Sequence, residues 1–359
     1  MHRTSPIMRT RSVLSATVLL YASTLDAQSS DTTTRIRLSG FVDTYYAYDL
    51  TRPADGERRF TTQSVRHDEV NVNLAWLGIT VERRQARARL AVQAGTSVQA
   101  NYAGEPRTGA TSGPDLARLI QEAVVGVRLA DRLWLDGGVY LSYIGLESWS
   151  SFENLTYTRS LVADYTPYYL SGAKLTWAAT PRLTAQFHVM NGWQNIAENN
   201  RGKAIGSRFD YAASPSITLS YANFVGNERP SGSRSVLRVY NQVMIKGTRA
   251  SGTQWQGQVD VGHQDRSDWY GLVAALRQPV TDHVALTGRV ERFSDPDQVI
   301  IGTGLQDGFT GNGASAGVDV TIDRGVQWRS ELRGIRTTAA LYPEGAARRP
   351  GRNNAVLVT

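Results

Sequence analysis

The sequence predicts an all-β protein, a transmembrane antiparallel up-and-down β-barrel of about sixteen strands with short periplasmic turns and long external loops. Three observations predict this fold. Segments of strand length alternate between apolar and polar residues, the links between them alternate between short and long, and the polar faces carry charges at mid-strand. Together they favour a cylinder whose apolar side faces lipid.

The alternation is clearest in VALTGRVERF at 284–293. Leu286 and Val290 point to one side and Arg289 to the other, because successive side chains of a strand face opposite sides. The pattern begins near residue 35, and around residue 70 it places Val70, Val72, Leu74 and Trp76 on the apolar face. Further strands are predicted at 86–93, 119–129, 133–144, 167–178, 183–193, 204–213, 217–226, 235–246, 254–263, 269–278, 283–293, 314–323 and 326–337, with a last fragment from about 354. Each is near the length that a tilted strand needs to cross a bilayer.

The links between these strands alternate in length. Short, turn-like links follow the even-numbered strands, at 82–85, 130–132, 179–182, 214–216 and 323–325. Mostly long, polar links follow the odd-numbered strands, at 50–68, 97–118, 145–166, 194–203, 294–313 and 338–353. The links at 247–253 and 264–268 depart from the rule. Tight turns at one end and longer loops at the other are typical of outer-membrane barrels, whereas a soluble sandwich has no reason for this order.

Charged residues in the middle of the polar faces indicate which face looks outward. Arginine facing lipid at the bilayer midplane costs on the order of 2–4 kcal/mol, and a wet lumen avoids that cost. We therefore expect the apolar faces to contact lipid and the charged faces to line a pore. The predicted pore-lining residues are Arg87, Arg89, Arg128, Asp136, Arg208, Asp210, Arg289, Glu291, Arg329, Glu331 and Arg333.

Aromatic residues cluster near the predicted strand ends. Amphipathic rings favour the headgroup level of a membrane, so these residues are expected to form two aromatic girdles. The set is Tyr46, Tyr48, Trp177, Trp193, Trp255, Trp269 and Trp328.

The first residues predict export. Arg3, Arg9 and Arg11 precede the apolar run 13–22, and a small residue follows at Ala27, so residues 1–27 are expected to be a signal peptide and residues 28–359 the mature barrel. The run is too short for a membrane-spanning helix. The absence of cysteine excludes a disulfide framework and thiolate metal sites. The net charge of +7 is spread along the chain, which argues against nucleic-acid binding.

Several segments resemble the β-barrel porins of the OmpL-like group. They are SGFVDTYYAYDLTRP at 39–53, IQEAVVGVR at 120–128, GLESWSSFENLTYTRSLVADYTPYYLSGAKLTW at 145–177, VMNGWQNIAENN at 189–200 and YANFVGNE at 221–228. They follow the family's order and cover most of the mature chain. The resemblance implies an outer-membrane barrel that acts as a pore. Such barrels usually close with a strand ending in an aromatic residue, whereas this sequence stops at Thr359, so we expect the natural closing strand to continue further.

A barrel of this size leaves an aqueous channel, so passive diffusion of small hydrophilic solutes is the leading hypothesis. The expected partners are outer-membrane lipid, these solutes and further copies of the chain, although no face identifies a trimer. Because the pore-lining set contains more arginine than acid, we expect a mild preference for anions. Two loops are candidates for the constriction, and both also fit solvated external loops; their candidate residues are Asp115, Glu147, Glu153, Arg159 and Asp164.

Three alternatives stay open. A soluble secreted β-protein could bind carbohydrate on its aromatics, a barrel hydrolase could act on lipid or protein, and a closed barrel could serve adhesion alone. GHQDRSD at 262–268 is the best catalytic or metal cluster, and a hydrated loop explains it better. RHDE at 66–69 lacks further metal ligands, and ENN at 198–200 with Asp210 is a weak calcium candidate. We therefore predict no enzyme activity, no catalytic residues, no metal and no cofactor.

Overall fold

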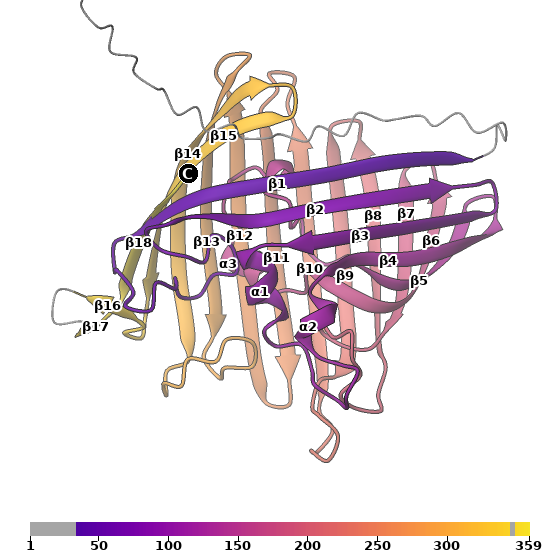
Figure 1. The fold of residues 1–359 in the computed structure, drawn as a ribbon, viewed down its shortest axis with the longest axis horizontal. Helices are drawn as coiled ribbons and strands as arrows, with labels where there is room; N and C mark the ends of the chain where they lie inside the picture. The colour runs from indigo at the N-terminus through magenta and orange to yellow at the C-terminus, as the bar shows by residue number, and fades with distance from the viewer. Residues whose placement is uncertain (1–33, 345–348) are drawn as a thin grey trace, which may run out of the picture.

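A computed structural model describes residues 34–344 and 349–359, so the predicted signal peptide at 1–27 lies outside the described residues. Sixteen antiparallel strands form a closed barrel, which confirms the predicted fold class (Figure 1). Its strands are β1 (Arg35–Asp49), β2 (Val70–Glu82), β3 (Ala86–Ala94), β4 (Ile120–Ala130), β5 (Leu133–Leu141), β6 (Tyr169–Thr180), β7 (Leu183–Met190), β8 (Ala204–Ser214), β9 (Ile217–Asn227), β10 (Leu237–Thr248), β11 (Gln254–Gln264), β12 (Ser267–Pro279), β13 (Val284–Asp295), β14 (Phe309–Asp323), β15 (Val326–Thr337) and β18 (Asn353–Val358).

Each strand from β1 to β14 pairs with the next one in sequence, and β18 lies between β15 and β1. Closure therefore rests on a strand of 6 residues. β18 pairs with β15 from Glu331 to Arg336 but with β1 only over Ala47–Asp49, and Tyr46 and Thr359 exchange two further backbone hydrogen bonds. The remainder of β1 has no strand on that side among the described residues.

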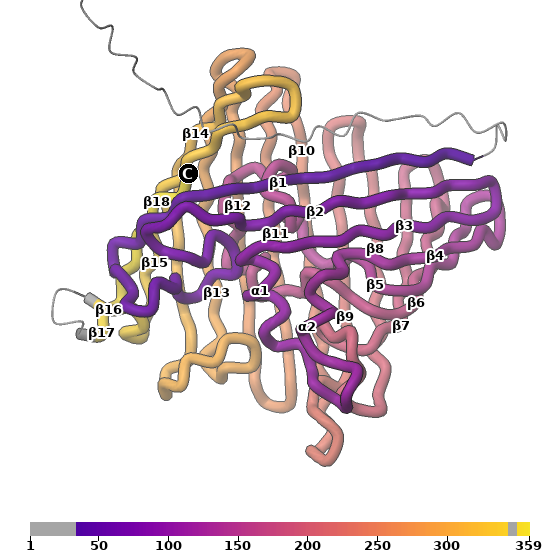
Figure 2. Tube along the Cα trace, in the orientation of Figure 1, coloured from indigo at the N-terminus to yellow at the C-terminus, as the bar shows by residue number. Residues whose placement is uncertain are grey.

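The long and short connections lie at opposite ends of the barrel. In Figure 2 the turns that join β10 to β11, β12 to β13 and β14 to β15 are at the top, and the long loops after β9 and β13 are at the bottom. The long connections carry the remaining elements, which are α1 (Thr96–Tyr102), α2 (Pro114–Ala117), the 3-10 turn Ser151–Glu153, α3 (Leu161–Asp164) and the small hairpin of β16 (Tyr342–Glu344) and β17 (Arg349–Gly351). No helix in the described part of the chain is long and apolar enough to cross a membrane.

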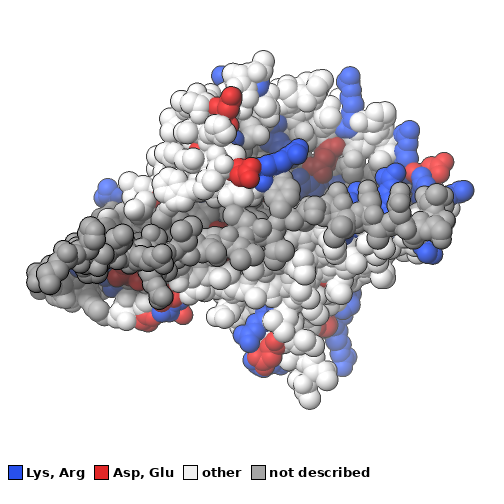
Figure 3. Space-filling view, turned by 45° about the horizontal axis from the view of Figure 1, so that its top comes forward, with Lys and Arg blue, Asp and Glu red and all other residues white. Residues whose placement is uncertain are grey.

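The two faces of the wall are inverted relative to a soluble sheet. On β13, the apolar residues Leu286 and Val290 are exposed on the outside, at 50% and 61%, while Arg289 and Glu291, which flank Val290, are buried at 2% and 5%. Broad areas without charged side chains separate the coloured groups in Figure 3. The barrel can therefore face lipid only with its outer surface.

One predicted face is wrong in part. Val70 is exposed as expected, but Leu74 is fully buried and Trp76 donates its indole N–H to Ser150 in the barrel interior. The cause is a β-bulge in β2 at Asn73, which has no partner between the pairs Asp43–Leu74 and Thr44–Val72. A bulge adds one residue to a strand and so exchanges the faces beyond it.

Candidate functional site

The connection between β5 and β6, residues 142–168, folds into the barrel; we call it the inner loop. Its backbone meets the wall on one side at β10 and β11, where Gly145 and Leu146 donate N–H groups to Gln242 and Gln258. On the other side Tyr157 donates to a carboxylate oxygen of Asp43 on β1, over 2.9 Å. The inner loop therefore crosses the lumen from wall to wall, and its role as the constriction stays a prediction.

A buried cluster of charges holds the inner loop to strands β13 to β15. We call Arg289, Glu291, Asp319, Arg329, Glu331 and Arg333 the buried charge cluster. The Glu291 carboxylate accepts the Leu161 N–H at 2.6 Å, and the Glu331 carboxylate accepts the Thr158 N–H at 2.6 Å. Arg289 and Arg333 bind these two carboxylates from the sides. Glu291 and Glu331 are thus each shared between arginine and loop backbone.

Arg329 continues the cluster toward the turn end of the barrel. Its guanidinium lies 2.7 Å from the carboxylate of Asp319 and donates to the backbone oxygens of Ser151 and Asn154. Burying charge costs several kcal/mol per ion, and only good geometry with further hydrogen bonds offsets that cost. The loop backbone supplies those hydrogen bonds, so the cluster and the inner loop depend on each other.

Glu147 ties the inner loop to itself. One carboxylate oxygen accepts hydrogen bonds from the Ser160 N–H and hydroxyl groups, at 2.8 and 3.0 Å, just before α3. The other oxygen is buried without a hydrogen-bond partner among the described residues. Burial raises the pKa of the Glu147 carboxyl above its usual 4.5, and the nearby Arg289 and Arg159 oppose the shift.

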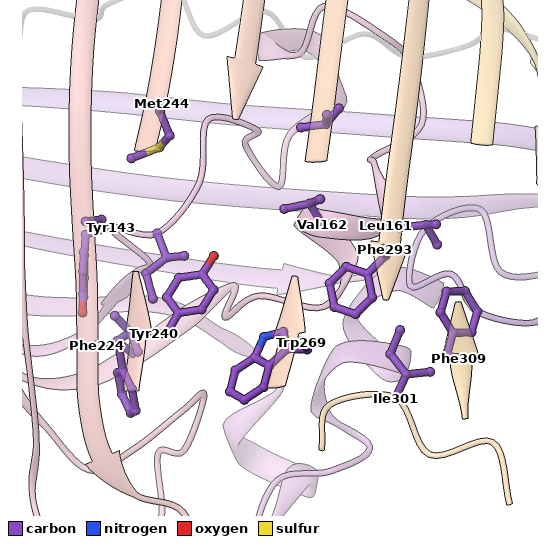
Figure 4. Packing of buried hydrophobic residues seen from close by; sticks show 14 of the residues in the cluster. Tyr143, Leu161, Val162, Phe224, Tyr240, Met244, Trp269, Phe293, Ile301 and Phe309 are labelled. Atoms are coloured by element: carbon purple, nitrogen blue, oxygen red, sulfur yellow. The ribbon is translucent and has the colours of Figure 1, made fainter. Parts of the chain in front are cut away.

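Apolar side chains fill the space between the inner loop and the long-loop end. In Figure 4, Leu161 and Val162 of the inner loop lie among Phe293, Trp269 and Tyr240 from the wall, and these residues belong to one buried cluster. Trp193 packs edge-on against Phe224 and Tyr240 within the same region. The external mouth is therefore narrowed by packed side chains as well as by the loop.

This packing corrects two predicted girdle residues. Trp269 is 2% exposed and points inward, and Trp193 packs on inward-facing rings, so neither can contact lipid. Both lie near strand ends, but at the mouth of the barrel that position also serves loop packing. The other five lie on the outer face, Tyr46 and Tyr48 at the loop end and Trp177, Trp255 and Trp328 near the turns. Their membrane role stays a prediction.

The opposite side of the lumen, strands β3 to β8, carries several partly exposed charges and binds the backbone of the inner loop through Arg208; we call it the open wall. Arg87 binds both oxygens of Asp136, at 2.7 and 2.5 Å. Gly126 makes room for this pair, since a Cβ there would lie 2.1 Å from Asp136 Oδ1. Arg89 pairs with Glu122 and donates to the hydroxyl of Thr80.

A polar cavity of about 370 Å³ lies between the open wall and the start of the inner loop. Arg208 and Asp210 form an ion pair at 2.9 Å on its edge, and Arg208 also donates to the backbone oxygens of Tyr143 and Gly145. Gly206 leaves space for Tyr143, because a Cβ there would lie 1.7 Å from its hydroxyl oxygen. The cavity is lined by Glu122, Tyr140, Leu141, Ser142, Tyr143, Lys174, Gln186, Arg208 and Asp210.

All eleven predicted pore-lining residues lie on inward-facing positions, but they divide into two groups. Arg289, Glu291, Arg329, Glu331 and Arg333 are in the buried charge cluster. Arg87, Arg89, Asp136, Arg208 and Asp210 are on the open wall, and Arg128 lies near the turns, where it donates to the Ala130 and Asp131 carbonyls. Their role in conduction stays a prediction.

The constriction-loop candidates also divide. Arg159 and Asp164 are buried within the inner loop and Glu147 is partly buried there, whereas Glu153 is exposed on it. Asp115 lies outside, in the exposed helix α2, where it pairs with Arg107. The loop that carries Asp115 contributes α1 instead, through a hydrogen bond from the Trp149 indole to Ser97.

Sequence reasoning missed Lys174 on the open wall and Asp319 in the buried charge cluster. Both sit at inward-facing positions of predicted strands, so the alternation pattern could have found them. The contacts of Asp43 with Asn73, Ser151 and Tyr157 gave no such signal, since they depend on the bulge and the loop.

A closed barrel with an apolar outside, a charged inside and a loop folded into its bore is the architecture of a diffusion channel in the outer membrane. The family described as "Putative beta-barrel porin-2, OmpL-like" matches residues 35–359, and the chain belongs to this family. The expected resemblance is thereby confirmed, and the protein is a porin.

Solved outer-membrane channels share the fold. The anion-selective porin from Comamonas acidovorans is similar with a TM-score of 0.57 and 11% identity, over 90% of this chain and 98% of that one. The outer membrane channel DcaP of Acinetobacter baumannii is similar with a TM-score of 0.60 and 10% identity, over 93% of this chain and 99% of that one. OmpF of Salmonella typhi, in complex with daunomycin, is similar with a TM-score of 0.58 and 10% identity, over 91% of this chain and 97% of that one. No curated protein matches the chain.

Proposed function

We propose that this porin passes small hydrophilic solutes along the open wall and past the inner loop, with a mild preference for anions. The observation that carries the proposal is the charge of the open wall. Strands β3 to β8 present five inward cations and three carboxylates; the cations are Arg87, Arg89, Arg128, Lys174 and Arg208, and the carboxylates are Glu122, Asp136 and Asp210. A surplus of fixed positive charge raises the local concentration of anions.

The proposal includes the location and the assembly. The chain enters the bacterial outer membrane after removal of residues 1–27, acts there without catalysis, and forms homo-oligomers. Intact mass of the protein purified from outer membranes would show a first residue at Gln28 if cleavage occurs as proposed. Cross-linking in native membranes tests the oligomer.

Planar-bilayer recording in a KCl gradient tests the pore. We expect stepwise conductance and a reversal potential whose sign indicates that chloride permeates more readily than potassium. A reversal potential of the opposite sign contradicts the anion preference. A folded barrel that passes no current contradicts the passage of solutes and favours an adhesive or structural role.

A further inference from the structure

Lys174 is a cation without an ion-pair partner in the wall of the polar cavity. Among the described residues no carboxylate lies within 4.0 Å of its amino group, which sits 4.9 Å from the ring centre of Tyr140. It is one of three lysines, with Lys203 and Lys246, in a chain with 39 Lys and Arg in all. An aromatic face attracts the ammonium group but leaves its charge available.

The neighbours of Lys174 explain why it is unpaired. Asp136 lies directly opposite on β5, but Arg87 occupies both of its carboxylate oxygens. The residue opposite on β7 is His188, which stacks on Tyr143 at 3.9 Å. Neither neighbouring strand therefore offers Lys174 a free counterion.

The other acids around the cavity are also paired with arginines. Glu122 pairs with Arg89, and Asp210 pairs with Arg208. Every carboxylate that lines the cavity thus has an arginine of its own, and one positive charge is left over at Lys174. A cavity with a single surplus cation favours a ligand with a single negative charge.

The remaining lining fits hydroxyl groups. The Gln186 amide faces the cavity and has no hydrogen-bond partner among the described residues, so it can both donate and accept. The Ser142 hydroxyl and the carboxylates of Glu122 and Asp210 also line the cavity and supply further hydrogen-bonding groups. A volume of about 370 Å³ is within the range of small-molecule sites.

We propose that this cavity is a binding position for a small hydroxylated monocarboxylate, such as a sugar acid, on its way through the pore. The ligand's carboxylate binds the Lys174 ammonium group, and its hydroxyl groups bind Gln186 and Ser142. The proposal rests on the pore function proposed above, since the solute reaches the cavity through the lumen. It goes further by naming the class of solute and the residue that selects it.

Gluconate and glucose separate the carboxylate from the hydroxyl groups. In single-channel recordings at equal KCl on both sides, we expect gluconate to cause brief current interruptions, with glucose at the same concentration much less effective. The variant Lys174→Gln should weaken the gluconate effect about tenfold while it still conducts chloride. Lys246→Gln is the matched control, because Lys246 is an inward residue of β10 outside the cavity, and it should keep the effect.

Equal interruption by glucose and gluconate, an unchanged effect in Lys174→Gln, or an equal loss in Lys246→Gln would overturn the proposal. Lys174→Arg retains the charge and should retain the gluconate effect, which guards against a general defect of the glutamine variant. Calorimetric titration of the wild-type protein in detergent with gluconate tests the site without any substitution. All of these measurements use equal salt, whereas the chloride preference is measured in a KCl gradient. The gluconate site can therefore be disproved while the chloride preference holds, and the chloride preference can be disproved while the gluconate site holds.

Discussion

The two sides of the lumen solve the problem of inward charge in different ways. The buried charge cluster has equal numbers of arginines and acids, all nearly inaccessible, and each is bound by the inner loop or by another member. The open wall has more cations than acids, and most of its charges are partly exposed; the Arg87 side chain, for example, is 33% exposed, although its partner Asp136 is buried. We therefore expect the first side to hold the inner loop in place and the second side to face the solute.

The largest expected effect comes from breaking the buried charge cluster. Glu291→Gln leaves Arg333 without a carboxylate partner in a buried site and removes one of the two carboxylates near Arg289, so we expect the free energy of unfolding to fall by roughly 3–5 kcal/mol. Urea titration of the protein in lipid vesicles, read by heat-modifiable gel migration, measures this change. Glu122→Gln on the open wall is the control, and its effect should be below about 1 kcal/mol because water screens the remaining Arg89. Equal losses in the two variants would contradict the division of the lumen.

Chemical access sharpens the same comparison. The chain has no cysteine, so a single introduced cysteine is the only thiol. Gln186→Cys should react completely with a charged thiol reagent and reduce the current, because Gln186 lines the polar cavity. Ser315→Cys places a similar group on an inward position of β14 where the native hydroxyl oxygen is buried, and it should stay unmodified until the protein is unfolded. Mass spectrometry after labelling measures the extent of thiol modification in each variant. Rapid labelling of Ser315→Cys would show that water reaches the buried side.

The third effect is on selectivity. Arg87→Gln removes one cation from the open wall and leaves Asp136 without its bidentate partner. A unit charge about 4 Å from a permeating ion contributes about 1 kcal/mol in water, so the chloride-to-potassium permeability ratio should fall by about fivefold. The reversal potential in a KCl gradient measures the ratio. The charge-retaining variant Arg87→Lys should keep most of it, and an unchanged ratio in Arg87→Gln would place the ion path elsewhere.

Strand alternation alone predicted one set of pore-lining charges and did not distinguish the buried charge cluster from the open wall. It placed Arg289 and Arg87 on inward faces because the side-chain period of a strand is two, and that part needs no knowledge of the loops. What separates them is the inner loop, whose contacts join residues more than 100 positions apart, such as Leu161 and Glu291. Nothing local in either segment encodes that meeting.

Two further misses have local causes. The bulge opposite Asp43 turned Leu74 and Trp76 inward, and an apolar alternation pattern cannot register one inserted residue. β14 begins at Phe309, five residues before its predicted start at 314, because Gly311 and Gly313 occupy inward positions and give no polar signal. Trp269 shows the same limit, since an aromatic near a strand end fits a membrane girdle and a packed mouth equally well.

A smaller, pH-dependent effect is expected at Glu147 in the inner loop. Its raised pKa means that the folded state binds this proton more tightly than the unfolded chain does. The stabilisation it gives is complete below pH 4.5, its ordinary value, and is lost as pH rises through the folded value. Glu147→Gln mimics the neutral form, so the difference in thermal stability between variant and wild type should grow in favour of the variant from pH 4.5 upward. A difference that does not change with pH would contradict this assignment.

The smallest effect is expected outside the lumen, at the turn between β11 and β12. His263 and Asp268 lie 2.6 Å apart there, with side chains 53% and 75% exposed, and they formed the strongest catalytic candidate in the sequence. Exposed pairs contribute little to stability, and this one is separated from both sides of the lumen by the barrel wall. His263→Gln and Asp268→Asn should therefore leave conductance, selectivity and thermal unfolding unchanged. Loss of a hydrolytic activity in either variant, measured with purified protein on phospholipid and peptide substrates, would show that the turn has a function of its own.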